Sequence, residues 1–329
     1  MEASPAFTLP PRVRFPGLAS AAFEHPADRA ALETLRRTPG LDRLIKWMYE
    51  LGVERLMRIF YVADSIRVSP RQYSRLYNDL REACAILDVT EPELYVVQLP
   101  IPNAVTFGME RHTIVMTTAL LDLLNDSERL WAIGHELGHI KAEHLLYRTM
   151  ALWLASVLKR GMDIFAMPGK ILSITLAYAL FEWFRKAELT ADRAGLLTIQ
   201  DPQVCITGLL KLVGGSQRLM DDLNPEEFTK QADQYEDMDD SLLNMYFKYL
   251  IVLKFMEDWE VHPFPVMRAR EIKEWAQSQQ YRRLLRGDYP RTDTEAGKRT
   301  CAACGTVVTN VAYRFCPECG QELGPVPAS

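Results

Sequence analysis

Three polar residues, His135, Glu136 and His139, form the pattern H-E-x-x-H inside the clearest predicted helix of the chain, residues 125–158. Residues four apart lie on one face of a helix, so both imidazoles can point at a single ion. Apolar residues surround the motif and predict that this part of the helix is buried. Unpaired polar groups there would cost a few kcal/mol each. The pattern therefore favours a metal site over the alternative, a polar patch on an amphipathic helix.

Zinc that hydrolyses a substrate needs a third protein ligand and an open fourth position. Glu188 and Asp192 lie four residues apart on a second predicted helix, residues 170–197. One of these carboxylates can reach the metal while the other accepts a hydrogen bond from a ligating imidazole. Glu136 would sit beside the metal without binding it and take a proton from water. For Glu188 and Asp192, a surface ion-pair face remains the alternative.

These motifs resemble a known family of enzymes. HELGHI at 135–140, followed about fifty residues later by ELTADRAG at 188–195, is similar to the M48 zinc metallopeptidases, the gluzincins that include HtpX-like and Ste24-like enzymes. The resemblance extends upstream to Pro102-Asn103-Ala104 with Gly108, and downstream to His262-Pro263 with Arg268. It covers about residues 94–274.

The resemblance implies a role for each matching residue. His135, His139 and Glu188 would bind the catalytic zinc, Glu136 would be general base and then general acid, and Asp192 would orient a ligand. His262 would stabilise the oxyanion of the intermediate, with a structural His-Pro turn as the alternative. Asn103, Ala104 and Arg268 are the predicted substrate-binding residues, and the strand of Asn103 would pair with an extended peptide. His144 is interpreted as structural.

Hydropathy patterns predict a mostly helical α+β fold, and the resemblance implies that this fold is of the gluzincin type. Residues 1–40 are rich in proline, which should block long regular elements, and are expected to form an arm lying on the body. The expected metallopeptidase domain, 41–285, has two or three helices over 41–87 and a helix over 271–285. Short β-favouring runs at 94–99, 104–107 and 112–116 predict a small antiparallel sheet. Asn125 and Glu128 resemble the capping box of the helix that carries the motif.

Four cysteines near the C-terminus form two C-x-x-C pairs, Cys301 with Cys304 and Cys316 with Cys319. This spacing is typical of a zinc ribbon, expected over residues 301–322 after a linker over 286–300. Four thiolates fill all four coordination positions of a tetrahedral zinc ion, so a second, structural zinc is predicted. The charge around the ribbon is modest and gives no strong indication of nucleic-acid binding. We therefore expect the ribbon to dock a protein partner. Cys84 and Cys205 are expected to be buried thiols.

Composition excludes a disordered or fibrous protein, because 48% of residues are hydrophobic and glycine and proline show no period. Acidic residues outnumber basic ones, 43 to 38, so the net charge of the chain does not attract nucleic acid or anionic lipid. Within the two predicted helices that carry the motifs, the longest charge-free runs are 149–158 and 171–181. They span about 15–17 Å, against about 30 Å for a bilayer core. We expect a cytoplasmic protein without a spanning helix, with peripheral membrane association left open.

The sequence therefore predicts a zinc-dependent endopeptidase that acts on polypeptide substrates and holds one catalytic and one structural zinc. The alternative is a latent or inactive protease-like protein that recruits partners through its zinc ribbon. In a latent protein, the N-terminal arm or the acidic stretch 221–240 would cover the cleft.

Overall fold

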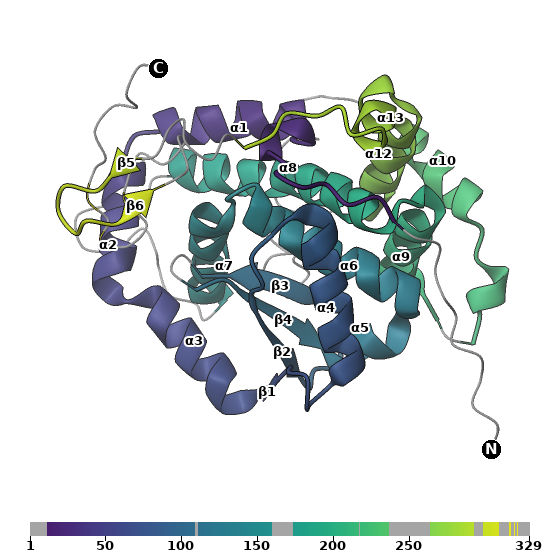
Figure 1. Cartoon of the computed structure of the whole chain (residues 1–329), viewed down its shortest axis with the longest axis horizontal. Coiled ribbons are helices and arrows are strands. Elements are labelled where there is room, and N and C mark those ends of the chain that lie inside the picture. The colour runs from purple at the N-terminus through teal and green to yellow at the C-terminus, as the bar shows by residue number, and fades with distance from the viewer. Residues whose placement is uncertain are drawn as a thin grey trace.

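The computed structural model describes residues 12–108, 111–159, 174–216, 218–236, 264–292, 299–308, 316, 319 and 321. In these ranges the chain is mostly helical and has one four-stranded sheet, so the expected α+β class is confirmed. A long helix, α8, crosses the upper part of the view in Figure 1, with α1 above it and with α6 and the sheet below it. The acidic stretch is described only as far as residue 236, within α10.

The sheet has the strand order β1-β2-β4-β3. Its strands are β1 (Ile66–Arg67), β2 (Glu93–Val97), β3 (Ala104–Phe107) and β4 (Thr113–Thr117). β4 pairs antiparallel with β3 but parallel with β2, so the sheet is mixed and not wholly antiparallel as expected. β3 does not pair with β2, because β4 lies between them. All five residues of β4 are buried, as suits a central strand, and β3 is left at the edge.

Two long helices carry the sequence motifs, α6 (Asp126–Lys141) and α8 (Ile174–Ile199). The predicted capping box of Asn125 and Glu128 is confirmed, since both of its hydrogen bonds are present at the start of α6. The expectation of one helix to residue 158 was wrong, because α6 ends and α7 (Leu145–Lys159) follows. Glu143, in the turn between them, has φ 60°. Neither glycine nor proline marks this break in the sequence.

The remaining helices pack around this pair and the sheet. Two or three helices were expected over residues 41–87, and the structure has three. The helix expected over 271–285 is two helices that meet at Ser278. The helices are α1 (Pro26–Arg37), α2 (Leu41–Leu51), α3 (Val53–Asp64), α4 (Ser74–Leu87), α5 (Thr118–Leu123), α9 (Pro202–Gly214), α10 (Pro225–Glu236), α12 (Pro265–Gln277) and α13 (Gln279–Leu285). Short 3-10 turns, Ser20–Ala22 and Met220–Asp222, precede α1 and α10. Side chains of α4 share one hydrophobic core with β2, β4 and α6.

The N-terminal segment forms part of the core in its described residues, 12–40. Phe15, Leu18 and Phe23 are fully buried in the same cluster as the sheet and α6. Pro26 does not block regular structure; it occupies the first turn of α1, where its missing N–H costs nothing. The described start of the expected linker, residues 286–292, packs on this segment, because Thr292 N–H donates to the Gly17 carbonyl at 2.8 Å.

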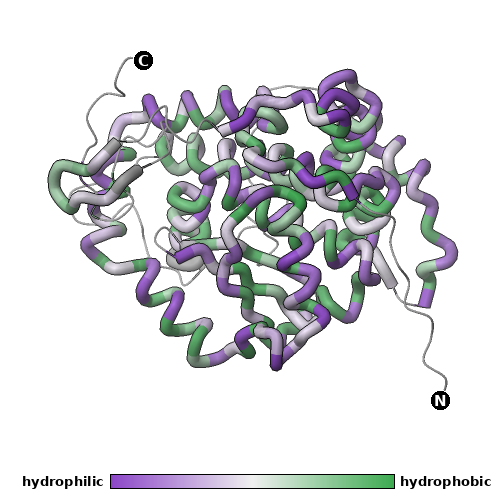
Figure 2. The backbone as a smooth tube through the Cα atoms, viewed as in Figure 1, coloured by the Kyte–Doolittle hydropathy of each residue, from purple (hydrophilic) through white to green (hydrophobic). Residues whose placement is uncertain are grey.

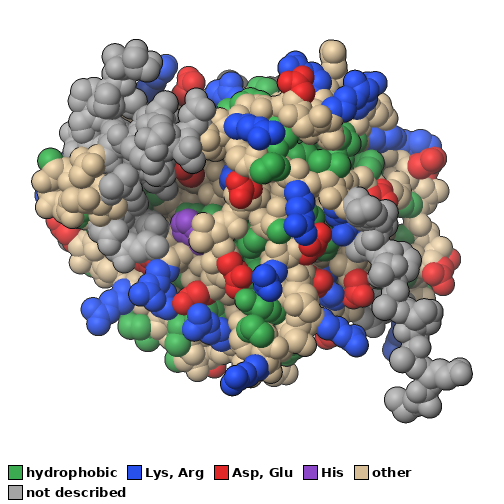
Figure 3. Space-filling model, viewed as in Figure 1, with side chains coloured by type: hydrophobic (Ala, Val, Ile, Leu, Met, Phe, Trp, Pro, Cys, Tyr) green, Lys and Arg blue, Asp and Glu red, His purple; other side chains and the backbone are tan. Residues whose placement is uncertain are grey.

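The surface mixes charges and apolar side chains. Lys and Arg are interspersed with Asp and Glu on the face shown in Figure 3. Along α3, at the lower left of Figure 2, hydrophobic and hydrophilic residues alternate, and Leu56, Ile59 and Phe60 are exposed. Among the helices that the structure describes, none has the length and apolar character needed to span a bilayer.

Candidate metal centre

Helices α6 and α8 bring His135, His139 and Glu188 together in the interior. His135 Nε2 lies 3.3 Å from Glu188 Oε2, and His139 Nε2 lies 3.3 Å from Glu188 Oε1. One ligand atom from each of the three residues lies within 4.8 Å of the other two. All three side chains are buried. The predicted constellation is therefore assembled in space, although Glu188 is far from the motif in sequence.

The donor set and its spacing fit zinc. Zinc bound at about 2.0–2.1 Å in a tetrahedron needs ligand atoms about 3.3 Å apart, close to the separations found here. His139 Nε2 is buried and has no hydrogen-bond partner among the described residues. Such an atom is costly unless it binds something. Two imidazoles and one carboxylate would also leave a fourth position for solvent.

Asp192 holds the opposite ring nitrogen of His135, with Oδ1 3.0 Å from Nδ1. Arg268 donates to both oxygens of Asp192, from Nε at 2.7 Å and from Nη2 at 2.6 Å. Burial alone would raise the pKa of Asp192, but the Arg268 guanidinium holds that pKa below its ordinary value. Burial alone would lower the pKa of His135, but its bonds to Asp192 and Glu188 raise it to about 9.

Glu136 faces strand β3 from helix α6, which also carries His135 and His139. Its Oε2 accepts a hydrogen bond from the Thr106 hydroxyl, and both side chains are buried. Arg148 Nη2 lies 3.8 Å from the same carboxylate oxygen. Glu136 is thus next to His135 in sequence, and its carboxylate contacts Thr106 on β3.

Arg148, on α7, is a site residue that the sequence interpretation missed. Its Nη1 donates to Glu188 Oε1 at 2.8 Å, and its Nε donates to the Thr106 carbonyl at 3.3 Å. Arg148 and Arg268 together balance part of the charge of three buried carboxylates, which would otherwise be strongly unfavourable. The available signal was a single arginine in an otherwise apolar helical stretch.

A narrow pocket opens beside His135 and Glu136. Its volume is about 20 Å³, room for about one water molecule, and it is lined by Asn103, Ala104, Leu120, Trp131, Ala132, His135, Glu136, Leu212 and Arg268. All three predicted substrate-binding residues are therefore at this pocket. Ala104 pairs with Met116 in the edge strand β3. Arg268 is also bound to Asp192, as described above, and lies 3.3 Å from Glu188.

Two further predicted residues have different outcomes. His262, the expected oxyanion residue, lies outside the described residues. His144, interpreted as structural, contacts the cluster directly, with Nδ1 3.1 Å from His139 Nδ1. The helix break after α6 brings this contact about.

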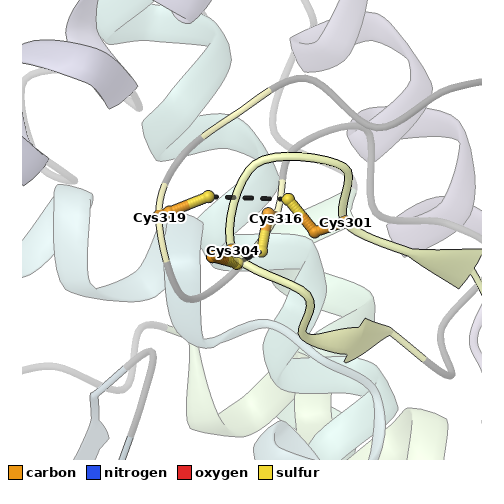
Figure 4. A group of neighbouring side chains, drawn as sticks. All are labelled: Cys301, Cys304, Cys316 and Cys319. Atoms are coloured by element: carbon orange, nitrogen blue, oxygen red, sulfur yellow. Dashed lines mark hydrogen bonds between the residues drawn. The ribbon is translucent and has the colours of Figure 1, made fainter.

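The four C-terminal cysteines also cluster (Figure 4). Sγ of Cys301 and Cys319 are 3.6 Å apart, and Sγ of Cys304 and Cys316 are 3.5 Å apart. Zinc bound to four thiolates at about 2.3 Å needs sulfur atoms about 3.8 Å apart, so this group fits a zinc ribbon. The short strands β5 (Arg299–Thr300) and β6 (Val307–Val308) pair beside it.

The two other cysteines, Cys84 and Cys205, are buried free thiols, as predicted. Burial raises the pKa of the Cys84 thiol to about 12. Such thiols are inert at neutral pH.

Comparison with known proteins gives a consistent result. Residues 70–276 match the model of Peptidase family M48. The chain is 37% identical over 278 residues to the plastoglobule-localized metallopeptidase 48, chloroplastic, of Arabidopsis thaliana, covering 84% of this chain and 78% of that relative. It is 26% identical over 192 residues to a protease HtpX homolog of Moorella thermoacetica, covering 51% and 62% of the two chains. The matched region contains both α6 and α8.

Proposed function

This chain belongs to peptidase family M48, and from that premise we propose that it is a zinc-dependent endopeptidase with Glu136 as general base. The observation that supports this proposal best is the cluster of His135, His139 and Glu188, whose spacing fits zinc. The two imidazoles and the Glu188 carboxylate would hold the ion. Zinc, when bound, supplies a Lewis acid for peptide-bond hydrolysis.

The proposed role of Glu136 is to take a proton from the attacking water and to return it to the leaving amine. Its carboxylate lies at the pocket beside His135, with Thr106 donating a hydrogen bond to it. That bond and the nearby Arg148 would hold the carboxylate in one orientation. The oxyanion role of His262 stays a prediction.

The proposed substrate is an extended polypeptide that pairs with the edge strand β3. Asn103 and Ala104 lie where this strand meets the pocket. An edge strand offers backbone groups to an added strand, which gives affinity without a strict sequence requirement. Arg268 would act on the reaction mainly through Asp192 and Glu188, since its guanidinium contacts both carboxylates.

Two further proposals concern the zinc ribbon and the cellular location of the chain. The four cysteines would hold a second zinc with a structural role, and a protein partner for the ribbon stays a prediction. The Arabidopsis thaliana relative is named for a chloroplast plastoglobule. For this chain a cytoplasmic location, with peripheral membrane contact left open, also stays a prediction.

The test of the proposed function is the substitution Glu136→Gln. The amide cannot act as a base, so we expect cleavage of an unfolded test protein to fall by about 100-fold or more while zinc content is unchanged. Asp126→Asn is the control, because this residue is exposed in the first turn of the same helix. Cleavage that survives Glu136→Gln would contradict the assignment. A zinc-loaded parent chain that cleaves nothing would support the latent binding protein instead.

A further inference from the structure

The N-terminal helix α1 reaches the metal centre through three buried side chains in contact. Asp28 Oδ2 lies 3.1 Å from His144 Nε2, and His144 Nδ1 lies 3.1 Å from His139 Nδ1. The exposed fractions of these side chains are at most 2%. Asp28 belongs to α1, whereas His144 lies in the turn after α6. Two elements far apart in sequence therefore meet behind the zinc-facing side of His139.

The surrounding hydrogen bonds set the direction of this chain of contacts. The Thr190 hydroxyl oxygen accepts from the His25 backbone N–H at 3.0 Å, so its own hydrogen is available to Asp28. It donates that hydrogen to Asp28 Oδ2, the oxygen that also faces His144. A carboxylate oxygen only accepts, so the hydrogen between Asp28 and His144 belongs on His144 Nε2.

The hydrogen on His144 Nε2 determines which nitrogen of His139 carries a hydrogen. In the neutral form of His144, which has one donor and one acceptor nitrogen, Nδ1 is then the acceptor. His139 Nδ1 therefore carries a hydrogen and donates it. His139 Nε2 is left with a lone pair, and this is the atom that lies 3.3 Å from Glu188 Oε1. The opposite arrangement would place a hydrogen on the nitrogen that faces the ion.

We propose that Asp28 and His144 are positioning residues that hold His139 in the tautomer able to bind zinc, an inference that rests on the proposed zinc site. Asp192 acts in the same way on His135, but by direct contact. Asp28 lies outside the residues 70–276 that match the family model. Helix α1 thus completes a centre whose other residues lie inside the matched region.

The main experiment measures zinc affinity by competition with a chelator. The parent is the full chain with Cys316→Ser and Cys319→Ser, so that the ribbon does not compete for metal. His144→Phe keeps a ring against Trp183, whose centroid is 5.4 Å from that of His144, but accepts no hydrogen bond. This substitution and Asp28→Ala are each expected to weaken zinc binding by about 10- to 100-fold.

Two further variants separate positioning from mere stability. Asp28→Asn keeps an acceptor oxygen for His144, so it should bind zinc more tightly than Asp28→Ala. Leu35→Ala removes a buried side chain from the same helix and should lower the free energy of unfolding without changing zinc affinity. Parent-like affinity in both His144→Phe and Asp28→Ala, or an equal loss in Leu35→Ala, would overturn the proposal. A parent that takes up no zinc would contradict the proposed function as well, which distinguishes the two failures.

A second measurement reads the tautomer directly in the natural chain and uses a variant only to assign signals. The zinc-loaded natural chain, labelled with ¹⁵N in the rings of its six histidines, reports which ring nitrogens carry hydrogen. The signals of His144 are assigned from their loss in His144→Phe. We expect hydrogen on Nε2 and none on Nδ1 of His144. Hydrogen on Nδ1, alone or together with Nε2, would refute the proposed tautomer.

Discussion

In each imidazole of the metal centre, the two ring nitrogens face different kinds of partner. Nε2 of both His135 and His139 faces the Glu188 carboxylate, while the Nδ1 atoms face Asp192 and His144. Both rings are therefore held in orientation by contacts within the protein. Such contacts reduce the ordering that metal binding must impose, and they raise affinity for that reason.

The carboxyl group of Glu143, in the turn after α6, should make the stability of the protein depend on pH. Burial raises the pKa of its carboxyl to about 7, from an ordinary value of 4.5. The folded state binds this proton more tightly than the unfolded state, so stability is lost as the pH rises from about 4.5 to about 7. The stabilisation by Glu143→Gln should be about 1–2 kcal/mol greater at pH 8 than at pH 5. Denaturant unfolding at both pH values measures it.

The control for this prediction is Glu50→Gln, because the Glu50 side chain is 62% exposed. Its effect should be the same at both pH values. An effect of Glu143→Gln that is also independent of pH would show that the carboxyl does not titrate as described.

Prediction at the residue scale was accurate where the proximity of two side chains depends on helical spacing. His135 with His139, and Glu188 with Asp192, each lie four positions apart, so the sequence alone places each pair on one face. Thr106, Arg148 and Asp28 could not be found in that way. They come from a strand and two other helices, and only tertiary packing brings them to the centre.

At the scale of elements, the centre depends on close contact between α6 and α8. A Cβ at Gly138 would lie 2.6 Å from Ala194 Cβ and 3.0 Å from Ala191 Cα, both on α8. Gly138→Ala should therefore push the helices apart and destabilise the protein by about 1–3 kcal/mol. This loss would outweigh a gain of up to about 1 kcal/mol in helix propensity. Thermal or denaturant unfolding measures the balance.

Gly214→Ala is the matched control for that substitution. Gly214 ends α9, and a Cβ there would meet nothing within 4 Å. This change should leave stability unchanged or raise it slightly. A Gly138→Ala protein as stable as Gly214→Ala would mean that the two helices tolerate a wider separation than the structure indicates.

Element-level prediction was accurate where a local signal exists. Apolar periodicity predicted the helices of 41–87 and most of α8, and the capping box predicted the start of α6. The break at Glu143 carries no glycine or proline, so the pattern runs through it. The parallel pairing of β2 with β4 was missed because strand order is a property of the whole sheet.

At the scale of the whole molecule, the described N-terminal segment belongs to the core and to the metal centre. Phe15, Leu18 and Phe23 fill the main hydrophobic cluster, and Asp28 contacts His144. Composition alone suggested an arm, because proline-rich sequence without periodicity gives no sign of where its few apolar residues pack. A contact across 162 positions, such as Thr190 with Asp28, leaves no local pattern.

The central claim is that His135, His139 and Glu188 form a zinc site distinct from the four-cysteine cluster. Metal content per chain tests it most directly, measured by elemental mass spectrometry on protein purified without chelators. We expect two zinc ions in the natural chain and one after either His135→Ala or Cys316→Ser. A natural chain with a single zinc, or a His135→Ala chain that still holds two, would contradict it.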